Sequence, residues 1–283
     1  MYAFRILPLA ALLLSLSAAE AQQSASPPLP EIRQLMREVM DHQKQLEKVR
    51  ETYTYSSAQT TEDIDARGQV KKTETEEHEA FFVNGHLIER AVKKNGRALS
   101  EYEQQKETER VTKKVEKAER VPSDQPLEGQ GVSVSRVLEI MDVRNPRRES
   151  YHGRPAIVFD FVGRKDAKTH GLAEDASKKL EGTLWIDEAD RQVAHMEVKF
   201  NDDFRVAGGL FASIAKGSNF RFEQAQINGE IWLPTGGEGT IQARVLLVKN
   251  FRQHFTERDW DFKRFRVETQ QAKDSKIVSA QKQ

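Results

Sequence analysis

The sequence contains no cysteine, and this absence excludes several classes of protein at once. A chain without thiols forms no disulfide, holds no metal through cysteine and carries no thiol nucleophile. It also lacks the cysteine to which a lipid anchor could be attached after export. With 283 residues the chain is long enough to bury a core that is stable without disulfides, even in an oxidising compartment.

Neither sign of charge is in excess. The sequence holds 44 Lys and Arg against 44 Asp and Glu, although charged residues make up 31% of the chain. A protein without a net field does not attract polyanions over long distances. The composition therefore argues against nucleic acid as a partner.

Long apolar runs are scarce. The one long apolar run in the sequence is 6–19, which follows Arg5 and ends near the small residues Ala19 and Ala21. It is shorter than the roughly 20 residues that a membrane-spanning helix needs. This arrangement predicts a signal peptide over 1–21, cleaved near Ala21, with an uncleaved anchor as the alternative. The mature chain is then expected to be periplasmic or secreted and to have no transmembrane segment.

The remaining chain divides by composition. Residues 22–30 are rich in Ser and Pro and predict a disordered tether, and 269–283 form a polar tail without a pattern. Between them we expect a single domain over 31–268. It carries a charged helical insertion at about 97–128, followed by a short helix over 132–143.

No motif of a known catalytic or metal site is present. The seven histidines include no pair three to five residues apart. There is no nucleophile elbow and no phosphate-binding loop, and the glycines of 236–239 predict a turn instead. We therefore expect no catalytic residues, no metal and no cofactor. An enzyme whose site is assembled from distant residues stays open as a further hypothesis.

Strands dominate the pattern. Ala194, Met196, Val198 and Phe200 alternate with more polar neighbours over 193–200, which is typical of a strand with one buried face. The Asn-Gly pairs at 84–85 and 228–229 are strong signals for tight hairpins. These patterns predict an antiparallel sheet with one apolar and one solvated face.

Two long helices are expected besides the strands. The segment 32–53 has an apolar stripe at helical spacing and should lie across the sheet. A highly charged helix begins at Ser100, which forms a capping box with Glu103, and extends to about Arg120. This second helix is either a solvated insertion or a lid or docking arm.

Two segments near the C-terminal end invite a functional interpretation. Aromatic and basic residues alternate over 251–266, which predicts a turn at 251–258 and a final strand with a bulge at Lys263-Arg264. Its basic side chains face solvent or touch anionic lipid or a partner. The loop 206–217 carries Leu210 and Phe211 between glycines. It is either a short helix packed on the sheet or an apolar flap. The hinges of such a flap would be Gly208, Gly209 and Gly217.

The sequence resembles the periplasmic lipoprotein-carrier (LolA/LolB-like) superfamily. The resemblance lies in the first helix, in the strand and turn at 182–200 and in the hairpin at 228–234 (Asn-Gly-Glu-Ile-Trp-Leu-Pro). The resemblance covers about 31–268 and is nearest to uncharacterised members that are like outer-membrane lipoprotein-sorting proteins. It implies an α+β fold that is mainly antiparallel β, a curved sheet or incomplete β-barrel with helices on the concave face. In the carriers that face holds acyl chains. The charged segment departs from the pattern, and no functional residue of the family can be placed here.

The resemblance leads to two main hypotheses. The first is a binding protein that shelters lipid, or the acyl chain of an acylated protein, in an apolar cavity of several hundred Å³. The second is a non-enzymatic envelope protein that fills the same scaffold with its own helices and acts on an envelope partner through its surface. For the first hypothesis the expected cavity lining is Phe159, Phe161, Met196, Val198, Phe200, Phe211 and Trp232.

Overall fold

The computed structural model describes residues 28–122, 127, 132–246 and 249–264. The predicted signal peptide and the polar tail lie outside these residues, as do residues 22–27 of the predicted tether. The described helices are α1 Ile32–Arg50, α2 Glu101–Arg120, α3 Val134–Ile140 and α4 Leu172–Ser177, with a 3-10 turn η1 Ala207–Gly209. None of them combines the length and the apolar character that a membrane crossing requires.

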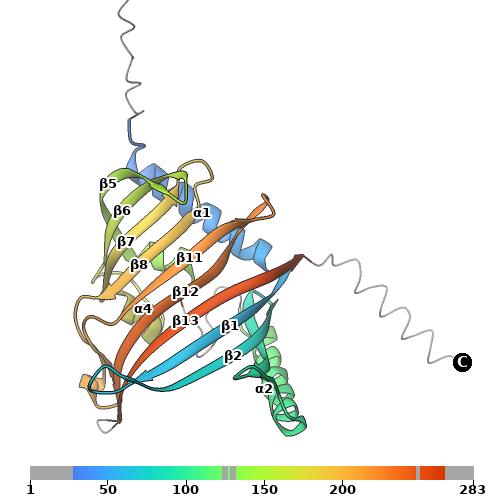
Figure 1. The fold of residues 1–283 in the computed structure, drawn as a ribbon. Helices are drawn as coiled ribbons and strands as arrows, with labels where there is room; N and C mark the ends of the chain where they lie inside the picture. The colour runs from blue at the N-terminus through green and yellow to red at the C-terminus, as the bar shows by residue number, and fades with distance from the viewer. Residues whose placement is uncertain (1–27, 123–126, 128–131, 247–248, 265–283) are drawn as a thin grey trace, which may run out of the picture.

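The described strands form one antiparallel sheet (Figure 1). Their order across it is β4-β3-β2-β1-β13-β12-β11-β8-β7-β6-β5, with the short β9 and β10 attached beside β12. The strands are β1 Tyr53–Ile64, β2 Val70–Val83, β3 His86–Lys94, β4 Arg97–Ala98, β5 Met141–Tyr151, β6 Arg154–Gly163, β7 Leu180–Asp187, β8 Val193–Phe200, β9 Phe204–Val206, β10 Ala212–Ile214, β11 Asn219–Ile227, β12 Ile231–Val245 and β13 Lys249–Arg264.

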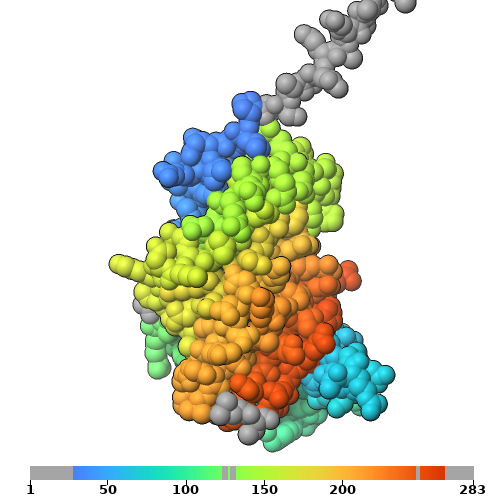
Figure 2. Space-filling model, turned by 90° about the vertical axis from the view of Figure 1, so that its left-hand side faces the viewer, coloured from blue at the N-terminus to red at the C-terminus, as the bar shows by residue number. Residues whose placement is uncertain are grey.

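The sheet is curved and does not close, because β4 and β5 at its two ends are not paired with each other. The helices α1, α3 and α4 lie on its concave side, so the predicted fold class is confirmed: mainly antiparallel β in an incomplete barrel (Figure 1). The first and last described strands, β1 and β13, are neighbours near the middle of the sheet, with Thr54 opposite Lys263. Figure 2 shows the turn between β1 and β2, in cyan, beside β13 in red.

The main core forms where α1 and α3 press on the concave side of β6, β7 and β8. Phe159, Leu184 and Met196 are direct cross-strand neighbours and are buried, and Leu35 and Val39 of α1 belong to the same cluster. Fully burying side chains of this size stabilises the fold by about 1.5–3 kcal/mol each. The apolar stripe expected on the first helix is therefore confirmed as a core-facing surface.

The charged helix α2 begins with the capping box predicted at Ser100 and Glu103. It lies along β3 and provides partners for the backbone of that strand. Glu107 accepts a hydrogen bond from the backbone N–H of Ala91 at 2.6 Å, and Arg110 donates to the carbonyl of Glu89 at 2.6 Å. An uncovered edge strand is a template for pairing with other chains, so α2 protects this edge.

Three local predictions near the C-terminal end are wrong. The glycines of 236–239 form no turn, because β12 continues through them from Ile231 to Val245. Residues 251–258 likewise form part of β13 rather than a turn. The bulge lies at Asp261, where φ is +56° and the register with β1 shifts, and not at Lys263-Arg264. The Asn-Gly hairpins are confirmed, since Asn84 and Asn228 adopt the positive φ that such turns require.

A candidate ligand cavity on the concave face

An apolar hollow, here called the central cavity, lies between the helices α3 and α4 and the concave side of β8, β11, β12 and β13. Its volume is about 390 Å³. Helix α3 separates it from a second hollow, because Val137 faces the central cavity and its neighbour Leu138 faces away. The residues that line the central cavity are Val132, Val134, Val137, Ala173, Ala176, Ser177, Leu180, Met196, Phe200, Phe220, Arg221, Phe222, Pro234, Gly236, Gly237, Phe255, Glu257 and Asp259.

Glycines in the interior of β12 explain why the sheet is hollow here. Gly237 stands between Phe222 of β11 and Glu257 of β13 in one cross-strand row, so this row lacks a side chain at its centre. A Cβ atom on Gly237 would lie 2.8 Å from the carbonyl oxygen of Arg221, closer than real contacts of this kind. The neighbouring backbone thus requires glycine, and glycine in turn leaves space that the helices above do not fill.

The roof of the central cavity is made of small and branched residues. Ala173 and Ala176 of α4 face it, together with Val134 and Val137 of α3. Larger residues on α4 would close the hollow, as side chains do elsewhere in this core. The roof is therefore the place where a single substitution can remove the cavity without touching the sheet.

One end of the cavity is acidic. Glu257 and Asp259 occupy alternate positions of β13 and both line the hollow. Burial, together with the negative charge of Glu257, raises the pKa of the Asp259 carboxyl to about 7, although a hydrogen bond from Ser57 and the charge of Arg50 act in the opposite direction. Burial also raises the pKa of Glu257. One Asp259 oxygen, Oδ1, is buried without a hydrogen-bond partner.

An ionic network joins the two roof helices. The Arg136 guanidinium on α3 forms two parallel hydrogen bonds to the Glu174 carboxylate on α4, at 3.0 and 2.9 Å, and a third to Glu139 at 2.8 Å. Glu139 is also 2.6 Å from Lys44 of α1. Burial opposes the ionisation of Glu174, but Arg136 and the backbone N–H of His170 keep its pKa below the usual value. The network ties the roof to α1.

Glu174→Gln is expected to weaken this roof by about 2 kcal/mol at pH 7, because the bidentate pair loses its charge. The Glu174 pKa is lowered in the folded protein, so its contribution is present above about pH 4.5 and is lost as the pH falls further. Urea unfolding of both proteins at pH 7 and pH 3 measures this. The two stabilities should converge in acid, and a difference that is equally large at pH 3 would contradict the assignment.

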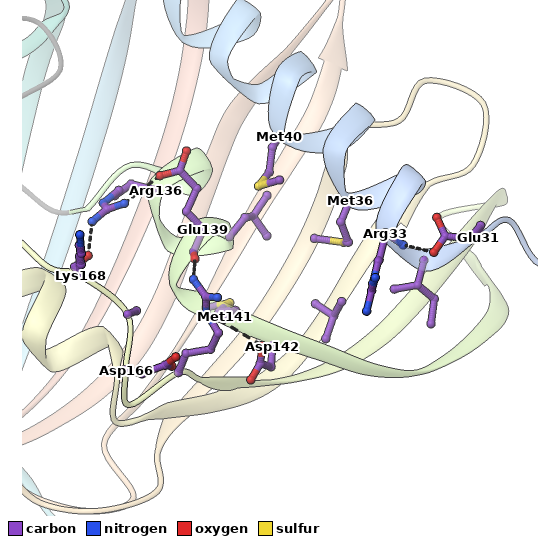
Figure 3. Close-up of a pocket in the computed structure, with 15 residues that line it drawn as sticks. Glu31, Arg33, Met36, Met40, Arg136, Glu139, Met141, Asp142, Asp166 and Lys168 are labelled. Carbon is purple, nitrogen blue, oxygen red and sulfur yellow. Dashed lines mark hydrogen bonds and ion pairs between the residues drawn. The ribbon is translucent and has the colours of Figure 1, made fainter.

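The second hollow is the methionine groove, which lies on the other side of α3 and is wider and more open, with a volume of about 910 Å³. Met36 and Met40 extend from α1 toward the strand that carries Met141 (Figure 3). Its rim is charged on all sides, with Arg33 and Asp142 among the lining residues. Methionine side chains adapt to irregular apolar shapes, so this groove suits a loosely fitting apolar group at the surface.

A polar cluster surrounds His195 on β8, whose side chain alternates with that of Met196 and so lies on the opposite face of the sheet. The imidazole is 4% exposed and lies 2.8 Å from Glu223 through Nδ1. The Tyr151 hydroxyl donates to the same Glu223 carboxylate at 2.6 Å, and the Tyr151 and His195 rings stack. His195 lines neither the central cavity nor the methionine groove. In the described residues no group of three or more His, Cys, Asp or Glu is placed to hold a metal ion.

The structure divides the seven expected lining residues. Met196 and Phe200 line the central cavity. Phe159, Phe161 and Val198 share the main core with them but do not line this cavity. Trp232 belongs to a separate core cluster, where its indole N–H donates to Asp190 at 2.9 Å. Phe211 is 55% exposed at the tip of the β9–β10 hairpin.

The expected flap is a small hairpin. β9 pairs with β10, and β10 pairs with the end of β12 far from its glycines, with Ala212 opposite Val245. Gly208, Gly209 and Gly217 all have positive φ, as expected for tight connections around this hairpin. Their role as hinges stays a prediction.

Comparison with models of protein families finds no match to this sequence, and comparison with curated proteins finds none either. Among solved structures the chain is similar to a domain named as an outer membrane lipoprotein-sorting protein from Vibrio parahaemolyticus. That similarity has 10% identity and a TM-score of 0.39, and it covers 84% of this chain and 94% of that one. A DUF1329 family protein from Desulfovibrio piger is similar at 9% identity and a TM-score of 0.37, over 83% and 94%. Both similarities concern the fold alone.

Proposed function

We propose that this chain is a periplasmic or secreted binding protein that shelters the acyl chain of a lipid or acylated protein in the central cavity. The observation that carries the proposal is a partly open hollow of about 390 Å³ whose lining is mainly aromatic and aliphatic. Binding pockets for small molecules typically measure about 300–1,000 Å³ and are mostly apolar. Transfer of an apolar chain from water into such a space is favourable, because it removes apolar surface from water.

The arrangement of the concave face also supports binding rather than catalysis. Most of the lining is apolar: the floor is glycine, and around it stand four phenylalanines, Phe200, Phe220, Phe222 and Phe255, which offer contact area to an apolar chain. The alternative is an envelope protein that fills the scaffold with its own helices. It requires the cavity to close in solution and the protein to act through its surface.

Native mass spectrometry of residues 22–283, purified without harsh detergent, is the first test. We expect a mass excess that disappears after organic extraction, because an apolar cavity retains an amphiphile from its surroundings. A bare polypeptide mass that stays bare after incubation with phospholipid would contradict the proposal and favour the self-filled scaffold.

A substitution in the roof tests whether the central cavity is the site. Ala176→Phe should fill the hollow and weaken binding of the neutral fluorescent probe N-phenyl-1-naphthylamine at least tenfold, because the ring takes the space of the probe. Leu172→Phe is the matched control, since Leu172 lies on the same helix, is exposed and does not line the cavity. Fluorescence titration should give the same affinity for L172F as for the wild type. Equal binding by A176F would place the site elsewhere.

A further inference from the structure

The apolar cavity ends in two carboxyl groups that its lining does not need for packing. Phe255, Glu257 and Asp259 are alternate residues of β13, so their side chains project from the same face of the sheet into the hollow. A strand advances about 6.6–6.8 Å over two residues, which sets the spacing between the two acids. Carboxyl groups are costly to bury beside phenyl rings, and such groups are normally paired.

These two acids are not paired within the described part of the chain. Neither makes an ion pair there, and Asp259 is only 7% exposed, with Oδ1 lacking any hydrogen-bond partner. Glu89 adds a further negative charge to both acids. The basic side chain whose charge acts on Asp259 is Arg50, and it lowers the pKa of that carboxyl. Its guanidinium lies over the Phe82 ring, 5.7 Å from the ring centre.

The other basic residue of the lining does not neutralise the acids either. The Arg221 guanidinium is paired with Glu238 at 2.6 Å. The acidic end therefore has negative charge and acceptor atoms to offer, and no compensating donor of its own beyond Ser57.

The chemistry that satisfies such an end is a compact cation with several donors. A primary ammonium group carries three N–H donors on one point charge and can bond two carboxylates at once. A carboxylate or phosphate head group would be repelled by the same acids. A bare metal ion is a poor alternative, because Ca²⁺ takes six to eight oxygen ligands and the rest of the lining is apolar.

We infer that the central cavity takes an amphiphile whose head group carries a protonated amine, with the ammonium group bound between Glu257 and Asp259 and the apolar chain among the phenylalanines. This inference rests on the proposed function, since it assigns the class of ligand for the same cavity. It adds that the protein discriminates between amphiphiles by the charge of the head group, whereas an apolar cavity alone distinguishes only their chains.

The test compares three probes that share one chain and differ in head group: dodecylamine, dodecanol and dodecanoate. Each displaces N-phenyl-1-naphthylamine from the wild-type protein at pH 8, where the amine is protonated. We expect half-displacement at a concentration at least tenfold lower for dodecylamine than for dodecanol, and dodecanoate to be the weakest of the three.

The double variant Glu257→Gln with Asp259→Asn tests whether the two acids cause the preference for the amine, because it keeps the shape of the side chains and removes both charges. We expect dodecylamine to lose its advantage and bind within about threefold of dodecanol, while dodecanol binds as it does to the wild type. Asp261→Asn is the matched control, because Asp261 lies on the same strand, is exposed and pairs with Lys263. It should retain the full preference. Should the double variant not fold, the single variants D259N and E257Q carry the comparison.

The outcomes separate this inference from the proposed function. If all three probes bind equally to the wild type, or if dodecanoate binds tightest, the head-group assignment is overturned while the cavity remains a lipid site. The same holds if E257Q/D259N retains the preference for the amine. If no probe displaces the fluorophore and the fluorophore itself does not bind, both the proposed function and this inference fail.

Discussion

Replacing Gly182 with alanine is expected to destabilise the protein by about 3 kcal/mol or more, the upper end of the range for overpacked cores. Gly182 lies in β7 opposite Phe161 on one side and Val198 on the other. An added Cβ atom would overlap the carbonyl oxygen of Glu197 and lie 2.8 Å from the Phe161 ring. Both neighbours belong to the packed sheet, so one of the two strand pairs would have to separate. Urea unfolding followed by circular dichroism measures the loss.

Thr183→Ala provides the control for this prediction. Thr183 is the next residue of the same strand and projects from the opposite face, where it is half-buried. Its replacement removes a β-branched side chain without adding volume, and its effect should stay within about 1 kcal/mol. A G182A protein that unfolds at the same urea concentration as T183A would show that the strands can yield at this point.

The second large effect concerns Asp259, whose replacement by asparagine is expected to stabilise the protein at pH 8 by about 4 kcal/mol. Burial raises the pKa of this carboxyl to about 7 in the folded protein, whereas the pKa of a free aspartate is near 3.8. Between these values the folded state holds a proton that the unfolded state has released. The free energy of unfolding therefore falls as the pH rises from about 4 to about 7, by roughly 1.4 kcal/mol for each pKa unit.

The check is a series of urea unfolding curves for wild type, D259N and D261N between pH 4 and pH 8. The difference between D259N and wild type should be small at pH 4 and grow toward neutral pH, with the opposite sign to the Glu174 effect. Glu257, whose charge acts on Asp259, and Tyr55, which responds to the charge of Asp259, are present in both proteins. The D261N curve should run parallel to that of the wild type. Parallel curves for D259N would contradict the raised pKa.

A protein that is more stable without Asp259 keeps that residue at a cost. Buried charges of this kind persist where they serve binding, because groups that bind a ligand are often unfavourable in its absence. A bound ammonium group would convert the unfavourable carboxylate into a paired one. The expected stability gain of D259N and the expected loss of amine preference are therefore two consequences of one side chain.

Patterns fixed by neighbouring residues were predictable from the sequence. The capping box at Ser100, the Asn-Gly turns and the apolar stripe of α1 depend on contacts within a few residues, and the structure contains all of them. The alternation over 193–200 also holds for Met196, Val198 and Phe200. It fails at Val193 and His195, which are also buried. At Val193 the register between β7 and β8 shifts, and this places the residue beside Ile186.

The central cavity was only partly predictable, because the features that make it hollow are non-local. Local preference at Gly236 and Gly237 indicates a turn, but the close approach of Arg221 and Glu257 keeps these glycines inside a strand. The sequence does show that Phe255, Glu257 and Asp259 stand at every second position and so share one face of a strand. What the sequence did not reveal is that this side of β13 faces the helices, since that depends on pairing with β1, far away in the chain.

The pairing of β1 with β13 determines when the chain can complete its folding. Joining Thr54 to Lys263 closes a loop that contains most of the polypeptide, and a loop of this length costs much entropy before its contacts form. The hairpins on either side, β1–β4 and β5–β12, pair with close neighbours in the sequence and can assemble earlier. β13 follows β12 directly and pairs with it, so the edge that waits is that of β1, which is open to other copies of the chain until β13 pairs with it. The edge of β1 therefore stays exposed until the last described strand has paired with it.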